Sequence, residues 1–222
     1  MNVQPAVLLM LAVLGSFLGV EAAPQWLSVS MFVVVGFFSL LSHEMGHALV
    51  GRCLGGGSPK VVVSWLGGDC CNPDGVFTRG QGLFMTAAGP LFTLMEAVIA
   101  ALLLCWLCGD WQAGLSFAAN AVFGRFAPDA YGGCSSAVVL FLAYTVQVGT
   151  WWAVLNLLPI FPLDGGQIMH GFMVSPRRMH IISLSASLCC MLLCAALGFW
   201  LMIVFLGFLA YFNYRCLWYT SH

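Results

Sequence analysis

The sequence predicts an all-α polytopic membrane protein, with about six transmembrane helices and a small membrane-associated β-hairpin or sheet between the second and the third. Two observations lead to this prediction. Of the 222 residues, 61% are hydrophobic and only 7% are charged, whereas a soluble domain typically has about 25% charged residues. The mean hydropathy is +0.97, and long apolar runs recur with the charges in the gaps between them. We expect residues 1–222 to form a single transmembrane domain.

The spans are predicted from apolar runs that approach the roughly 20 residues a helix needs to cross a bilayer. The first run could instead be a signal peptide, because Val20-Glu21-Ala22 resembles a small-residue cleavage site, but no Lys or Arg precedes its apolar core. Pro90 suits the first position of the third helix. Gly198 divides a final run that is too long for one span. The predicted spans are residues 5–20, 26–50, 90–108, 136–158, 179–197 and 199–214.

The basic residues are distributed as the positive-inside rule expects for this number of spans. One long last helix would move Arg215 across the membrane and weaken the asymmetry. We therefore expect both termini in the cytosol, in the cell (inner) membrane, with membrane lipid around the spans. The net charge of -1, without a Lys/Arg run, excludes nucleic acid as a main partner. The expected cytosolic side carries Arg52, Lys60, Arg79, Arg177, Arg178 and Arg215, and the other side only Arg125.

A metal-binding motif lies inside the second predicted span, in the sequence His43-Glu44-Met45-Gly46-His47. Residues four apart on a helix share one face about 6 Å along the axis, so both imidazoles can reach one metal ion with Glu44 beside them. Ionisable groups are costly inside a membrane and normally mark a pathway, a pair or a bound ion. The motif therefore predicts a metal site rather than a chance cluster.

A catalytic zinc ion usually takes a third protein ligand and leaves one position open for water. Asp164 is the best candidate for this ligand. It lies in a segment in which Pro159 and Pro162 end a helix and two glycines free the backbone beside the carboxylate. The alternative role for Asp164 is the N-cap of a short following helix, which is compatible with metal binding.

The two motifs together resemble the site-2 proteases, polytopic zinc metalloproteases that cut peptide bonds at membrane depth. These motifs are HExxH in an apolar helix and, much later, NxxPxxPLDGG, and the resemblance covers about residues 32–173. It implies one Zn²⁺ ion per chain held by His43, His47 and Asp164, with Glu44 as the general base toward zinc-activated water. It also implies that Asn156 helps to hold the substrate or its oxyanion. The implied substrate is a transmembrane or membrane-associated protein, cut towards the cytosolic side.

Two departures from the family pattern affect these expectations. The family often has Asn three residues after the proline of a Gly-Pro pair in the third span, where this sequence has Thr93. Thr93 therefore takes over a part of that residue's role at the substrate or oxyanion, or none of it. Many members also carry a PDZ or CBS domain, and because this sequence shows neither, we do not expect regulation through one.

The segment from Lys60 to Leu66 is rich in β-forming residues and bounded by glycines, which predicts a strand at the membrane face. An exposed edge at Val62 and Val63 could pair with unwound substrate by strand addition. The alternative is a strand whose edges are satisfied within its own sheet. The sequence Asn72-Pro73-Asp74-Gly75 predicts a turn.

Several other polar residues have open interpretations. Glu96 in the third span either handles substrate or water, or is protonated and bonded to a neighbouring helix. His170 and His180 are expected at the membrane interface. The ten cysteines show no disulfide framework. The segment of residues 109–135 is expected to form a cap or lid.

Two other functions compete with a zinc endopeptidase. One is a membrane zinc or proton transporter, because His and Asp inside a membrane also build ion pathways. The other is a catalytically silent relative that binds membrane partners. A transporter does not need Glu44 between two ligands, and a silent relative is free to lose Glu44 or a ligand, so the full set favours the enzyme. The sequence does not indicate the oligomeric state.

Overall fold

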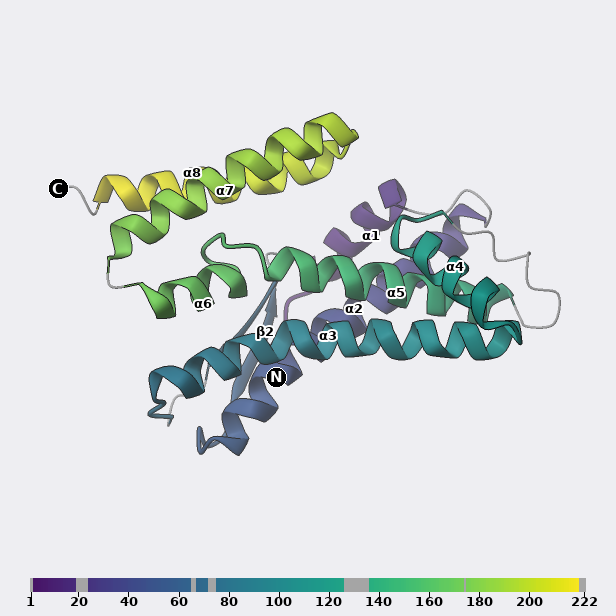
Figure 1. The fold of residues 1–222 in the computed structure, drawn as a ribbon, viewed down its shortest axis with the longest axis horizontal. Coiled ribbons are helices and arrows are strands. Elements are labelled where there is room, and N and C mark those ends of the chain that lie inside the picture. The colour runs from purple at the N-terminus through teal and green to yellow at the C-terminus, as the bar shows by residue number, and fades with distance from the viewer. Residues whose placement is uncertain are drawn as a thin grey trace. The chain divides into compact units, whose positions relative to one another are not determined.

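The computed structural model describes residues 2–18, 24–64, 67–71, 75–125, 136–173 and 175–219. Helices dominate these residues (Figure 1), which confirms the predicted fold class. The strands are β1 (Asn2–Val3), β2 (Lys60–Ser64) and β3 (Gly67–Cys71). The helices are α1 (Ala6–Leu18), α2 (Gln25–Cys53), α3 (Arg79–Cys108), α4 (Trp111–Val122), α5 (Ser136–Asn156), α6 (Asp164–Phe172), α7 (Pro176–Leu197) and α8 (Trp200–Tyr219).

Among the described residues, 5 helices are long and apolar enough to cross a membrane, namely α2, α3, α5, α7 and α8. The remaining predicted span falls on α1, which has 13 residues. At 1.5 Å per residue this helix is about 20 Å long, shorter than a bilayer core of about 30 Å. The count of six spans therefore stays a prediction. The possible cleavage site at Val20-Glu21-Ala22 lies outside the described residues.

The break that the sequence placed at Gly198 is present. Gly198 caps the C-terminus of α7 in the left-handed conformation, with φ of 78°, and its N–H donates to the carbonyls of Ala195 and Cys194. The chain reverses there, and α8 returns beside α7 (Figure 1). A single long last helix is thus excluded, because the reversal is built at the residue that the sequence indicated.

The start of the third span differs from the prediction. Pro90 lies inside α3, because the helix begins at Arg79. The reason is a capping box: the Thr78 N–H donates to Gln81 Oε1 at 2.9 Å, and the Gln81 N–H donates to Thr78 Oγ1 at 3.3 Å. These bonds satisfy amide groups that a helix N-terminus otherwise leaves unpaired. The helix then continues through Pro90 despite the missing N–H.

The predicted cap or lid contains a helix that the sequence reading missed. Asp110 is the N-cap of α4 and accepts hydrogen bonds from the Gln112 and Ala113 amides. Gly114 of α4 lies so close to Cys105 of α3 that a side chain there would overlap the Cys105 backbone. The first part of the segment is therefore packed against α3, and residues 126–135 lie outside the described residues.

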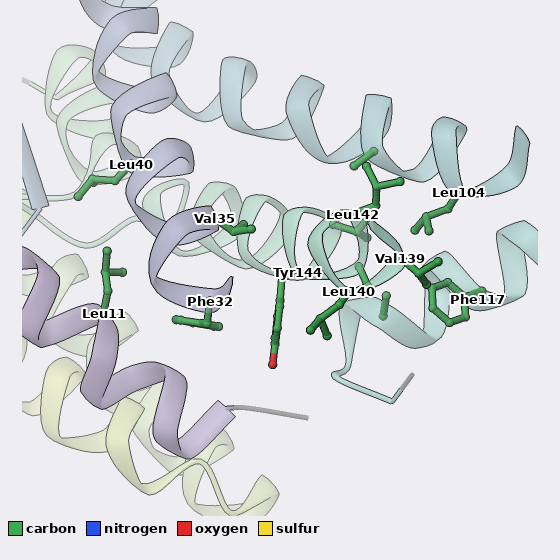
Figure 2. Close-up of a cluster of buried hydrophobic side chains, with 14 of the residues drawn as sticks. Leu11, Phe32, Val35, Leu40, Leu104, Phe117, Val139, Leu140, Leu142 and Tyr144 are labelled. Carbon is green, nitrogen blue, oxygen red and sulfur yellow. The ribbon is translucent and has the colours of Figure 1, made fainter. Parts of the chain in front are cut away.

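The chain forms two compact units. The first comprises residues 1–76 and 88–153, and the second residues 77–87 and 154–222. The first has a hydrophobic core in which α2, α3, α4 and α5 meet (Figure 2); its labelled side chains include Phe32, Val35, Leu104, Phe117 and Tyr144. The second has a smaller core around Ile160, Leu206 and Leu209.

The sheet of the first unit has the order β1-β2-β3, so β2 is its central strand. Val62 pairs with Asn2 of β1 in parallel and with Asp69 of β3 in antiparallel orientation, and Val63 likewise pairs with Val3 and Gly68. The predicted exposed edge at Val62 and Val63 is therefore wrong, because neighbouring strands occupy both sides. The alternative, edges satisfied within the sheet, is what the structure has. Residues 72–74 of the predicted turn lie outside the described residues.

Candidate metal centre

The helix α2 carries the residues of the HEMGH motif near its C-terminal end. His43 and Glu44 are buried, each 3% exposed, in a helix otherwise made mostly of apolar residues. His47 lies one turn further along and is partly buried. Burial of such polar groups is costly unless they are bonded or bind an ion.

The two imidazoles are arranged as metal ligands would be. His43 Nε2 and His47 Nε2 lie 3.2 Å apart, and the rings meet edge to face with their centroids 4.8 Å apart. Two nitrogen atoms at Zn–N distances of about 2.0–2.1 Å in a tetrahedral site would be about 3.3 Å apart. The observed spacing therefore fits two ligands of one zinc ion.

Glycines allow α3 to approach this face of α2 closely. A methyl group at Gly46 would lie 2.8 Å from the Ala88 carbonyl oxygen of α3. A methyl group at Gly89 would overlap His47 Nε2 and lie 2.9 Å from His43 Nε2. The backbone of α3 at Gly89 therefore lies directly against both imidazoles. Any side chain larger than that of glycine would collide with them.

Thr93 fixes the orientation of His43. Its side chain is fully buried, and Thr93 Oγ1 donates to the Gly89 carbonyl at 3.0 Å and lies 3.2 Å from His43 Nδ1. Because the hydroxyl proton is used on Gly89, its lone pairs accept from His43 Nδ1–H. That tautomer leaves the Nε2 lone pair available for a metal. Thr93 thus contacts a predicted ligand, a role the sequence reading did not assign to it.

Asp164 belongs to the second unit and is buried, 7% exposed. The alternative role of Asp164 as an N-cap is not what the structure has, because Leu163 occupies the N-cap without a side-chain cap and Asp164 is the first residue of α6. The next two residues have no room for side chains. A methyl group at Gly165 would overlap the Leu157 and Leu158 carbonyls, and one at Gly166 would overlap the backbone of Ile160 and Phe161. The preceding loop therefore directly supports the turn that carries Asp164.

The remaining candidates have mixed outcomes. Asn156, the last residue of α5, is buried at 9% exposed. Glu96 is partly buried on α3, one turn beyond Thr93, and its role stays a prediction. His170 is exposed in the last turn of α6. His180 is buried and bonded to Asn213, and its place at the membrane interface stays a prediction.

Comparison with known proteins assigns the chain to a class. The solved site-2 protease from Methanocaldococcus jannaschii has a similar fold, with a TM-score of 0.53 and 16% sequence identity over 95% of this chain and 86% of that chain. The "Putative zinc metalloprotease Rip3" of Mycobacterium tuberculosis (strains Erdman and H37Rv) is 29% identical over 161 residues, 72% of this chain. The alignment covers 35% of that protein's length, so this chain spans about a third of these curated relatives. The structural match shows that the chain shares the fold of this site-2 protease.

A match to a protein-family model shows the family of the chain. Residues 77–201 match the model of Peptidase family M50, and the chain belongs to this family. The matched range contains the segment with Asn156 and Asp164, whereas the HEMGH motif lies before it. The family assignment and the histidine geometry are therefore independent observations. The family and the five long apolar helices together indicate that the chain is an integral membrane protein.

Proposed function

We propose that this protein is an intramembrane zinc endopeptidase, which hydrolyses a peptide bond in a transmembrane or membrane-associated protein. The observation that supports this most strongly is the 3.2 Å spacing of His43 Nε2 and His47 Nε2, beside a buried Glu44, in a helix apolar enough to cross a membrane. The family of the chain provides independent support.

His43, His47 and Asp164 are the proposed zinc ligands. Two imidazoles and a carboxylate are a donor set that can hold a metal ion, and they are among the ligand sets that catalytic zinc sites use. When bound, zinc would supply Lewis-acid activation of water and of the scissile carbonyl. Thr93 keeps His43 in the tautomer that presents Nε2, and Gly89 leaves room for both rings.

Glu44 is the proposed general base. It would take a proton from the attacking water and return it to the leaving amine, so that the carboxylate ends each cycle as it began. Asn156 is proposed to bind the substrate backbone or the oxyanion, since its amide N–H groups can donate to a carbonyl oxygen. We also propose that the chain lies in the cell membrane with both termini and the site towards the cytosol, on the basis of its basic residues.

The first test combines metal analysis with proteolysis. The purified full chain and its variants Asp164→Asn and Glu44→Gln are analysed for zinc, and each is incubated with unfolded casein to detect new N-termini. We expect about one zinc per chain in wild type and in Glu44→Gln, and little in Asp164→Asn. Of these three proteins, we expect only the wild type to cleave casein.

Asp110→Asn is the matched carboxylate control. Asp110 is exposed and caps α4, and Asn caps helices about as well, so this variant should keep both zinc and cleavage. If Asp164→Asn binds zinc as well as the wild type does, Asp164 is not the third zinc ligand. If Glu44→Gln still cleaves casein, Glu44 is not the general base. A wild type that moves zinc into liposomes and cleaves nothing would replace the peptidase by a transporter.

A further inference from the structure

The loop before Asp164 is held by buried polar side chains of α7 and α8. The Phe161 N–H donates to Ser183 Oγ at 3.0 Å, and the Phe161 carbonyl accepts from Asn213 Nδ2 at 2.6 Å. Both polar groups of one loop residue are thus bonded by two different helices. Ser183 and Asn213 are fully buried, and burial makes each such bond expensive to lose.

His180 orients the Asn213 amide. Its Nδ1 lies 2.9 Å from Asn213 Oδ1, while Asn213 Nδ2 donates to both Phe161 and Leu209 carbonyls. An amide has one acceptor end and one donor end, so the bond from His180 Nδ1–H directs the donor end towards Phe161. The His180 ring also packs edge-on against the Phe161 ring, with centroids 5.7 Å apart.

Phe161 in turn supports the first turn of α6. A methyl group at Gly166 would overlap the Ile160 carbonyl carbon and the Phe161 nitrogen, so the two backbones are in direct contact. Leu163 N–H donates to the Ile160 carbonyl at 2.9 Å and fixes the residue immediately before Asp164. A displacement of Phe161 would therefore move the backbone that carries Asp164.

We propose that Ser183, His180 and Asn213 are positioning residues, which hold Phe161 and thereby fix the loop that presents Asp164 to the metal. The inference rests on the proposed function, in which Asp164 is a zinc ligand. It gives the helices α7 and α8 a role in the site although none of their residues is a proposed ligand. Residues that orient metal ligands typically change metal affinity about 10- to 100-fold when substituted.

The test measures zinc affinity and coordination on the full chain in detergent. Asn213→Asp keeps the acceptor for His180 and removes the donor to Phe161, and Ser183→Ala removes the acceptor for the Phe161 N–H. Zinc affinity is measured by competition with a chelator, and Co²⁺ added to metal-free protein reports the ligand geometry through its visible absorption. We expect zinc binding about 10-fold weaker or worse in both variants and an altered Co²⁺ spectrum.

Ser187→Ala is the matched control. Ser187 is fully buried on the same helix, one turn from Ser183, and its hydroxyl donates to the Ser183 carbonyl within α7. It should bind both metals as the wild type does. Ser183→Thr keeps the hydroxyl and should restore binding relative to Ser183→Ala, which separates the bond to Phe161 from a general loss of folding.

Wild-type affinity and an unchanged Co²⁺ spectrum in Asn213→Asp and Ser183→Ala would overturn the inference and leave the proposed function intact. Equal weakening in Ser187→Ala would also overturn it, because the effect would then follow from any lost buried bond. A wild type that binds no zinc would overturn the proposed function itself.

Discussion

Gly89 determines how closely α3 approaches the two histidines. A methyl group there would overlap His47 Nε2, so we expect Gly89→Ala to displace the imidazole and to reduce bound zinc to well below one ion per chain. Elemental analysis of the purified variant measures this. Gly82→Ala is the control, because Gly82 lies in the same helix with nothing within 4 Å of an added methyl group, and alanine favours a helix by about 1 kcal/mol over glycine. Full zinc occupancy in Gly89→Ala would show that the helices can separate there at no cost.

Thr93 contributes a single hydroxyl, which Thr93→Val removes with little change in shape. His43 Nδ1–H would lose the acceptor it has in Thr93 Oγ1, and we expect zinc affinity to fall about 10-fold or more. Chelator competition measures the change. Thr93→Ser keeps the hydroxyl and should lie close to wild type. If the Thr93→Val and Thr93→Ser variants bind zinc equally well, the hydroxyl does not orient His43.

Helix ends were predictable where a local signal specifies them. Gly198 breaks the last apolar run, and the structure has a left-handed cap there. The Thr78–Gln81 capping box is also a local signal, but the start was predicted at Pro90, which lies inside the same helix. A proline tolerated inside a helix cannot be told from one at its first position by local sequence alone.

The cap at Gly198 makes a prediction about stability. With φ of 78°, alanine at this position would cost about 1 kcal/mol in the left-handed region. We expect Gly198→Ala to lower the thermal unfolding midpoint of the protein in detergent. Gly207→Ala provides the comparison. Gly207 lies within α8, and a methyl group there would meet Met191 of α7 at an ordinary 3.6 Å, so this variant should leave the midpoint unchanged or raise it. An unchanged midpoint in Gly198→Ala would contradict the strain argument.

The sequence did not predict that β2 is the central strand of its sheet. Its β-forming residues predict a strand, but the partner β1 has only 2 residues and lies far away in the chain. Pairing of that kind depends on where α1 and α2 bring the N-terminus, and α1 packs on α2. The sequence therefore left open whether Val62 lies at an exposed edge, and the tertiary structure places it between two strands.

At the scale of the whole chain, the convergence of the two proposed histidine ligands was easier to predict than the residues that contact them. His43 and His47 are one helical turn apart, so their convergence follows from helix geometry alone. Gly89 and Thr93 meet them only because α2 and α3 cross there. His180 and Asn213 hold Phe161 through two helices that follow it in the chain. Such contacts depend on helix packing, which no local pattern in one sequence encodes.

The number of spans decides which face of the membrane holds each loop. If α1 crosses the bilayer together with α2, the N-terminus and the loop after Arg52 lie on one side; if α1 does not cross, they lie on opposite sides. The basic residues Arg52, Lys60 and Arg177 place their loops in the cytosol in either arrangement, and six spans put the N-terminus on that same side. We therefore expect reporters fused at the N-terminus, after Gly56 and after Ser175 to be cytosolic, and one after Arg125 to be non-cytosolic. A reporter enzyme active on one side only measures each position. Opposite results for the N-terminus and Gly56 would reduce the spans to the five long helices and place the N-terminus outside.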